Sequence, residues 1–309
     1  MMKLTSTSVG SRCAVRSVPS NMSTNATESP DSAARYDLSV PSNSSENNSQ
    51  KIQSLAAELY SDINKSDITK SDSTRSDSNK KAIQAVRDLA AMKLEEADSV
   101  LVDSLQACVD SLQTPSNQSA SQQIEQHLAV YGCAYQQLYA SASKTAKAFI
   151  KKTPNGIAKT ASQRDINYSE LQELLIQKDY QAADKLTTEL MCAIAGESAI
   201  KRKWVYFTEV SQFPNADMLT INRLWRAYSE DKFGWSQQRH LWIRLGRQWE
   251  RLWPQLKWQQ PDGNWTRYPT EFIWELDSAP VGHLPLSNQL RGVRVMDALL
   301  EHPAWFDGD

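Results

Sequence analysis

The sequence predicts an all-α protein, in which a small N-terminal helical bundle precedes a second helical domain with long ordered loops. Apolar residues recur at spacings of three and four over most of the chain, as on one face of a helix. Only 10 glycines and 12 prolines occur among 309 residues, which argues against a loop-rich β architecture. All ten tryptophans lie between Trp204 and Trp305, so the composition itself places a boundary between two domains.

Residues 1–50 are rich in Ser, Asn and Thr and contain a single aromatic residue, Tyr36. Such a segment buries too little apolar surface to offset its chain entropy, so we expect a disordered tail. The first twenty residues are Ser-rich and basic, and no acidic residue precedes Glu28. This composition is also typical of an organelle transit peptide, and that alternative stays open.

Residues 51–150 are predicted to form the helical bundle. Helical spacing of apolar residues begins at Ile52 and returns over 81–112 and 122–150. Between these runs, 61–80 repeats Ser-Asp-x-x-Lys/Arg four times. Alternating charge with few apolar side chains predicts a solvated insert or a frayed helix there. Turn residues then indicate a linker over 151–162.

The second domain is predicted over 163–305. Its helices are expected to begin at polar capping side chains, namely Asp165 or Asn167, Asp179, Asp217 and Ser236. Gly196 is a plausible end for the helix that starts at Asp179. Residues 257–285 mix prolines, glycines and aromatic residues, which predicts a long ordered loop region; compact domains rarely keep such a region without a use. A last helix is expected from 288 to 301.

The sequence offers no recognisable catalytic or metal-binding motif. It contains no P-loop, G-x-G-x-x-G, G-x-S-x-G or H-E-x-x-H pattern, and none of its four histidines has a second ligand at metal-binding spacing. We therefore expect no catalytic residue and no metal site. The four cysteines are far apart and are predicted to be reduced thiols of an intracellular protein. No apolar run approaches the roughly 20 residues that cross a bilayer.

The aromatic residues of the loop region suggest a ligand. Tryptophan often marks interfaces and ligand walls, and several aromatic residues fall in 257–285 instead of in a helical run. Arg291 and Arg294 follow, three residues apart, and so share a face if the segment is helical. Charges are nearly balanced over the chain, with a formal net charge of -2, which disfavours a nucleic-acid groove. A flat apolar ligand with one or two carboxylates, such as a porphyrin, fits better.

Six segments together resemble the core of the Genomes Uncoupled Four family, whose members bind tetrapyrroles and activate magnesium chelatase in chlorophyll synthesis. The resemblance runs from about Ser162 to Trp305, and the helical N-terminal part is similar to that of cyanobacterial members; residues 1–80 show none. The segments are WVYFTEVSQFP (204–214), LTINRLW (219–225), FGWSQQRHLW (233–242), WTRYP (265–269), SAPVGHLP (278–285) and NQLRGVRV (288–295).

The resemblance implies an all-helical core shaped like a cupped hand, which binds protoporphyrin IX and Mg-protoporphyrin IX as ligands. It implies no prosthetic group and no catalysis by the chain, and a partnership with the large porphyrin-binding subunit of magnesium chelatase. Tyr268 stands where the family has a tryptophan that contacts the porphyrin, and Asn288 stands where an amide could face bound magnesium. The ligand-binding residues implied are Arg291, Arg294, Tyr268, Phe272, Trp274, Asn288, Phe233, Trp235 and Phe213.

Two other functions stay open on the residues alone. One is an enzyme that modifies a tetrapyrrole and uses His240 or His283 as its acid–base group. The other is a single-stranded nucleic-acid module. The expected location is the cytoplasm of a cyanobacterium, with peripheral association at the thylakoid membrane left open. The alternative is the plastid stroma, if the first residues are a transit peptide.

Overall fold

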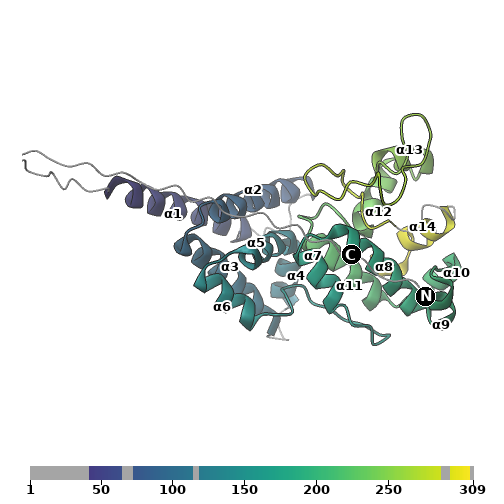
Figure 1. Cartoon of the computed structure of the whole chain (residues 1–309), viewed down its shortest axis with the longest axis horizontal. Coiled ribbons are helices and arrows are strands. Elements are labelled where there is room, and N and C mark those ends of the chain that lie inside the picture. The colour runs from purple at the N-terminus through teal and green to yellow at the C-terminus, as the bar shows by residue number, and fades with distance from the viewer. Residues whose placement is uncertain (1–41, 65–71, 114–117, 287–292, 307–309) are drawn as a thin grey trace, which may run out of the picture. The chain divides into compact units, whose positions relative to one another are not determined.

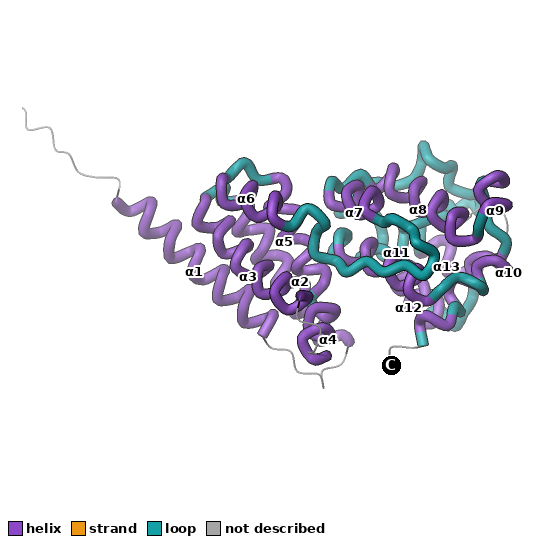
Figure 2. The backbone as a smooth tube through the Cα atoms, turned by 90° about the horizontal axis from the view of Figure 1, so that it is seen from below, coloured by secondary structure: helices purple, strands orange, loops and turns teal. Residues whose placement is uncertain are grey.

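A computed structural model describes residues 42–64, 72–113, 118–286 and 293–306 (Figure 1). Within these ranges the chain forms fourteen α-helices, one 3-10 helix and no β-strand (Figure 2). The predicted all-α class is therefore confirmed for the described part of the chain. No helix in these ranges combines the length and the hydropathy that a bilayer span requires.

The N-terminal helices are α1 (Ser42–Asn64), α2 (Asp72–Ala91), α3 (Glu95–Gln113), α4 (Gln118–Gln126), α5 (Leu128–Ala140) and α6 (Lys144–Lys152). Helix α1 begins at Ser42, so it includes the end of the segment expected to be disordered; residues 1–41 lie outside the described residues. The described parts of the Ser-Asp repeat lie in α1 and α2. There the repeat is helical, and residues 65–71 lie outside the described residues.

Helix α5 packs against N-terminal helices and also against α7 (Ser169–Ile176) and α11 (Asn215–Ala227) further along the chain. It contacts α2, α3 and α6, and ten of its thirteen residues are buried. Its sequence, LAVYGCAYQQLYA, is apolar on nearly every side, as expected of a helix surrounded by others. The side-chain amide of Gln136 donates hydrogen bonds to the carbonyls of Leu175 and Tyr228, each at 2.9 Å. A buried amide with two backbone partners thus links the bundle to the core.

The later helices, which fall where the second domain is predicted, are α7 (Ser169–Ile176), α8 (Tyr180–Ala195), α9 (Glu197–Arg202), α10 (Phe207–Val210), α11 (Asn215–Ala227), α12 (Trp235–Arg244), α13 (Trp249–Gln255), α14 (Val293–Leu300) and η1 (Pro303–Trp305). Helix α7 packs against both α8 and α11, and α14 packs against α10 and α12. The region between α13 and α14 has no helix among its described residues, as expected from its sequence.

Local capping predictions were correct where the partner is near in sequence. The carboxylate of Asp179 accepts a hydrogen bond from Ala182 N–H at the start of α8, and Gly196 follows its last residue with a positive φ of 106°. Asn167 also accepts a bond, from Ser169 N–H at the start of α7. These groups satisfy donors that the first helical turn leaves free.

Two capping predictions were wrong because the side chains bond to distant residues. Asp217 lies inside α11, is fully buried and accepts hydrogen bonds from Tyr168 Oη and Gln163 N–H. Ser236 follows the first residue of α12, and its hydroxyl and N–H both donate to the amide oxygen of Asn222. Each polar group therefore joins two segments of the core and does not start a helix.

Most of the tryptophan-rich composition is explained by packing. Trp225, Trp235, Trp242 and Trp258 are buried. Trp242, Trp249, Trp253 and Trp258 form a continuous stack with centroid separations of 4.7, 5.2 and 5.7 Å. Trp258 belongs to the loop region 257–285, but it lies in the core and donates its indole N–H to the His283 carbonyl at 2.8 Å. Tryptophan content by itself therefore does not locate the ligand.

Candidate functional site

The loop region between α13 and α14 is held in place by buried polar side chains. Gln238 on α12 donates its side-chain amide to the carbonyls of Gly282 and Pro285, at 3.0 and 2.8 Å. His283 is fully buried; its Nδ1 lies 2.6 Å from the Leu256 carbonyl, and its Nε2 accepts the Ile273 N–H at 3.1 Å. These bonds define the tautomer, with the proton on Nδ1.

His283 therefore has a structural role in the loop. Burial lowers its pKa, so the ring is neutral near pH 7. Both ring nitrogens already have backbone partners, and the ring lies 5.0 Å from that of Phe272. A general acid or base needs a nitrogen within reach of a ligand, and His283 has none free.

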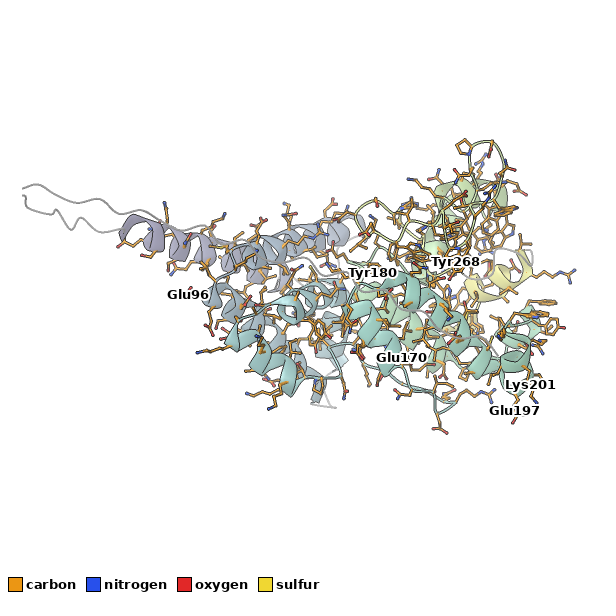
Figure 3. The ribbon with its side chains drawn as sticks, viewed as in Figure 1. Glu96, Glu170, Tyr180, Glu197, Lys201 and Tyr268 are labelled. Carbon is orange, nitrogen blue, oxygen red and sulfur yellow. The ribbon has the colours of Figure 1, made fainter. Side chains whose placement is uncertain are left out.

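Three aromatic rings of the loop region form a cluster, here called the aromatic trio: Tyr268, Phe272 and Trp274. Their ring centroids are 5.4 to 5.9 Å apart, and the Phe272 and Trp274 rings are stacked. Phe272 is buried, Trp274 is half-buried and donates its indole N–H to the Pro269 carbonyl at 3.1 Å, and Tyr268 is 40% exposed. The structure thus brings together three residues predicted for the site and leaves one ring, that of Tyr268 (labelled in Figure 3), open to solvent.

Arg294 lies beside a hollow of about 430 Å³. The hollow is formed by α10, α14 and the residues that follow α14, and its lining includes Phe207, Ser211, Asp297 and His302. The Arg294 guanidinium lies over the Phe207 ring, with its carbon 5.3 Å from the ring centroid. The exposed guanidinium has its charge available to an acidic group, while the ring beneath it is 37% exposed. The aromatic trio does not line this hollow.

Other residues predicted for the site lie elsewhere. Arg291 and Asn288 lie outside the described residues. Phe233 packs edge-on against Tyr180 at 5.4 Å and is fully buried, as is Trp235. Phe213 is 5% exposed, and its carbonyl receives a hydrogen bond from His302. Phe233, Trp235 and Phe213 therefore belong to the core and offer no open ring face to a ligand.

Comparison with known proteins decides the family. The GUN4-like family model matches residues 161–303. The Ycf53-like protein of Synechocystis sp. is 40% identical over 228 residues, which cover 73% of this chain and 91% of that protein.

The chain belongs to the GUN4-like family.

Other relatives of this GUN4-like chain come from algae and plants. The tetrapyrrole-binding protein of Arabidopsis thaliana chloroplasts is 36% identical over 146 residues, which cover 45% of this chain and 55% of that protein. The structure of GUN4 from Chlamydomonas reinhardtii has 37% sequence identity and a TM-score of 0.45, and the match covers 48% of this chain and 93% of that one.

Sequence reasoning missed one polar residue at the site of this GUN4-like chain. Asp184 on α8 is 2% exposed and accepts a hydrogen bond from Leu286 N–H at 2.6 Å. Burial and the charge of Asp184 together raise the pKa of the Tyr268 hydroxyl. A signal was present, because Asp184 falls on the same helical stripe as Tyr180, Ala183 and Thr187, which are buried. A carboxylate on an apolar stripe is rare without a partner.

Proposed function

We propose that this GUN4-like chain binds protoporphyrin IX and Mg-protoporphyrin IX without transforming them, and that it stimulates magnesium chelatase as a regulator of chlorophyll synthesis. The observation that carries the proposal is an arginine beside an open hollow, in the same domain as an aromatic cluster with one exposed ring. The name of the Arabidopsis relative, a tetrapyrrole-binding protein, supports the ligand class.

The chemistry of the hollow suits one acidic edge of a macrocycle. Its volume falls within the 300–1,000 Å³ typical of small-molecule sites. A guanidinium binds a carboxylate through two parallel hydrogen bonds, so Arg294 can hold one propionate. Glu301, which also lines the hollow, already pairs with Arg247 at 2.5 Å, which reduces its repulsion of an incoming acid. Phe207 offers an apolar surface directly below the guanidinium.

Three further assignments complete the proposed site. Tyr268 offers its exposed ring to the macrocycle, with Phe272 and Trp274 packed behind it. Arg291 acts with Arg294 on the propionates, and Asn288 offers an amide oxygen or a bound water to magnesium. The described residues contain no group of three or more His, Cys, Asp or Glu side chains placed to hold a metal ion. In this proposal the magnesium enters with its porphyrin.

The proposed partner is the large porphyrin-binding subunit of magnesium chelatase, to which this chain would deliver or from which it would withdraw porphyrin. The proposed location is a cyanobacterial cytoplasm with peripheral thylakoid association, or a plastid stroma. Relatives from a cyanobacterium and from chloroplasts support these two locations equally. The partner is tested by adding the purified chain to a reconstituted chelatase, where a higher initial rate at limiting porphyrin is expected.

The ligand assignment is tested by titrating the chain with a water-soluble porphyrin that carries two propionates, followed by tryptophan quenching. Replacing both Arg291 and Arg294 with alanine should weaken binding by one to two orders of magnitude, because a hydrogen bond to a charged group contributes about 1.5–3 kcal/mol before discounting for exposure. The single variant Arg294→Lys keeps a positive charge, so its affinity should lie between those of the double-alanine variant and the parent.

Arg244→Ala provides the matched control, since Arg244 is an exposed arginine at the end of α12 and lies outside the proposed site. Its affinity should equal that of the parent chain. The dimethyl ester of the same porphyrin should bind weakly to every variant. Equal affinity of the double-alanine variant and the parent for the diacid would overturn the assignment.

A further inference from the structure

The side chains that line the hollow beside Arg294 are more acidic than basic. Arg294, Asp297 and Glu301 follow one face of α14 and its continuation, at spacings of three and four. Glu301 keeps a helical hydrogen bond from its N–H to the Asp297 carbonyl, at 2.9 Å. His302 also lines the hollow and is neutral near pH 7, because burial lowers its pKa. The lining therefore carries one positive and two negative charges, which by itself disfavours an acidic ligand.

A second arginine, which does not line the hollow, offsets one of these negative charges. Arg247 Nη1 donates to the Glu301 carboxylate at 2.5 Å, although the two residues lie 54 positions apart in the chain. Arg247 follows the end of α12, and α12 packs against α14 (Figure 1). The Glu301 side chain is 31% exposed, so solvent screens this ion pair only in part. With Arg247 included, the charges of the hollow sum to zero.

The backbone and one aromatic ring hold Arg247 beside Glu301. The Arg247 N–H donates to the Trp242 carbonyl at 2.9 Å, which closes the end of α12. The Arg247 guanidinium carbon lies 5.3 Å from the centroid of the Trp242 ring. Trp242 is buried and stacks on Trp249, so this ring is a fixed support. An arginine restrained in this way loses less side-chain entropy when it forms an ion pair.

We propose that Arg247 determines the selectivity of the hollow for acidic macrocycles, because it neutralises the Glu301 carboxylate and leaves Arg294 to bind a propionate. This inference rests on the function proposed above. Arg294 is the group that contacts the acid, whereas Arg247 is a positioning residue that acts on the ligand through Glu301. Without Arg247, two carboxylates share the hollow with a single arginine, and an incoming propionate meets like charge.

A purely structural role for the Arg247–Glu301 ion pair makes a different prediction. The Arg247 side chain is 56% exposed, and ion pairs at such exposure contribute little to stability. The Arg247 φ of 59° also suits glycine, which lacks the Cβ that disfavours this conformation. Arg247→Gly should therefore leave the urea midpoint unchanged or raise it, while the affinity for an acidic porphyrin falls. A loss of affinity without a loss of stability assigns the effect to charge.

The experiment titrates the full chain at low salt with a water-soluble two-propionate porphyrin and with its dimethyl ester. Arg247→Gly and Arg247→Ala should each bind the diacid about three- to tenfold more weakly than the parent, because Glu301 keeps its charge without a partner. Arg247→Lys keeps the charge without the planar fork and should show an intermediate affinity. The dimethyl ester carries no acid, so its affinity should differ by less than about twofold among these chains.

Removal of the Glu301 carboxylate should restore the affinity that the Arg247 variants lose. Glu301→Gln should bind the diacid at least as tightly as the parent, since its hollow has one negative charge fewer. The double variant Arg247→Gly/Glu301→Gln should match Glu301→Gln, because Arg247 acts through that carboxylate. Higher salt should also reduce the difference between Arg247→Gly and the parent, because salt screens partly exposed charges.

Two other arginines of α12 provide matched controls. Arg239 also reaches α14, because its Nε donates to the Leu300 carbonyl at 3.0 Å, and its guanidinium lies over the Phe306 ring. Arg239→Ala therefore removes a contact with the same helix and leaves the Arg247–Glu301 pair in place. Arg244→Ala removes an exposed positive charge from the same helix. Both variants should bind the diacid within about twofold of the parent.

Four outcomes would overturn the proposal. If the parent binds the diacid and Arg247→Gly and Arg247→Ala bind it equally well, the selectivity role is wrong while the proposed function stands. If Arg239→Ala loses as much affinity as Arg247→Gly, the effect comes from the placement of α14. If the double variant stays as weak as Arg247→Gly, Arg247 does not act through Glu301. If the parent fails to bind the diacid, the proposed function fails and this inference fails with it.

Discussion

Replacing His283 should release the loop region that carries the aromatic trio. Its ring has backbone partners on both nitrogens, Leu256 O at 2.6 Å and Ile273 N at 3.1 Å, and both bonds are lost in His283→Ala. Each buried backbone group left without a partner costs about 1–3 kcal/mol, and loss of ring packing against Phe272 adds to this. We therefore expect the free energy of unfolding to fall by about 3–5 kcal/mol.

The assay is urea unfolding at pH 7.5, followed by tryptophan fluorescence, with the slope against denaturant checked for constancy. His283→Gln keeps a group that can accept the Ile273 N–H and should lose only about 1–2 kcal/mol. The control is Arg244→Ala at the exposed end of α12, which should change stability by less than about 0.5 kcal/mol. A His283→Ala chain within 1 kcal/mol of the parent would refute a structural role for this ring and would reopen a catalytic one.

Three further changes test the packing and the charges of the core. Gly132→Ala would place a Cβ 1.8 Å from the Ala227 carbonyl oxygen. The free energy of unfolding in urea should therefore fall by about 1–3 kcal/mol, despite the better helix propensity of alanine. A more stable variant would contradict this expectation. Asp217→Asn turns an amide donor toward Tyr168 Oη or Gln163 N–H and should cost about 2–4 kcal/mol in the same assay, and a neutral change would mean these bonds are unimportant. His302 donates to the Phe213 carbonyl and accepts from Ala304 N–H, and burial lowers its pKa below the usual 6.5, so the folded state is less able to take up a proton than the unfolded one. The parent should therefore lose stability relative to His302→Gln as the pH falls below 6.5. If the difference in melting temperature between the two proteins is the same at pH 7.5 and pH 5.5, the ring is not buried in its neutral form.

Features set by short-range sequence could be predicted, and those set by distant contacts could not. Asp179 and Gly196 bound α8 as expected, because a cap involves residues within one turn. Asp217 and Ser236 are also residue types that commonly cap helices, but their hydrogen-bond partners lie more than ten positions away. Sequence spacing gives no information about such partners. The helical class itself was predictable, because the apolar period extends along each helix.

The candidate site also combines features that short-range sequence predicts with features that depend on distant contacts. Tyr268, Phe272 and Trp274 lie within seven positions of one another, and their likeness to family segments selected them as a group. Phe233 and Trp235 fit the same description in sequence, yet tertiary packing buries both. Asp184 escaped prediction because its hydrogen-bond partner, Leu286, lies 102 positions further along the chain. Only the folded chain shows that a carboxylate on α8 bonds to the loop region between α13 and α14.

The most direct measurement is a crystal structure of this chain with Mg-protoporphyrin IX bound. The account predicts one propionate within about 4 Å of the Arg294 guanidinium, in the hollow between α10 and α14, with the macrocycle reaching the Tyr268 ring. A macrocycle bound on another face, with Arg294 still over Phe207 and no acid beside it, would contradict the proposed site.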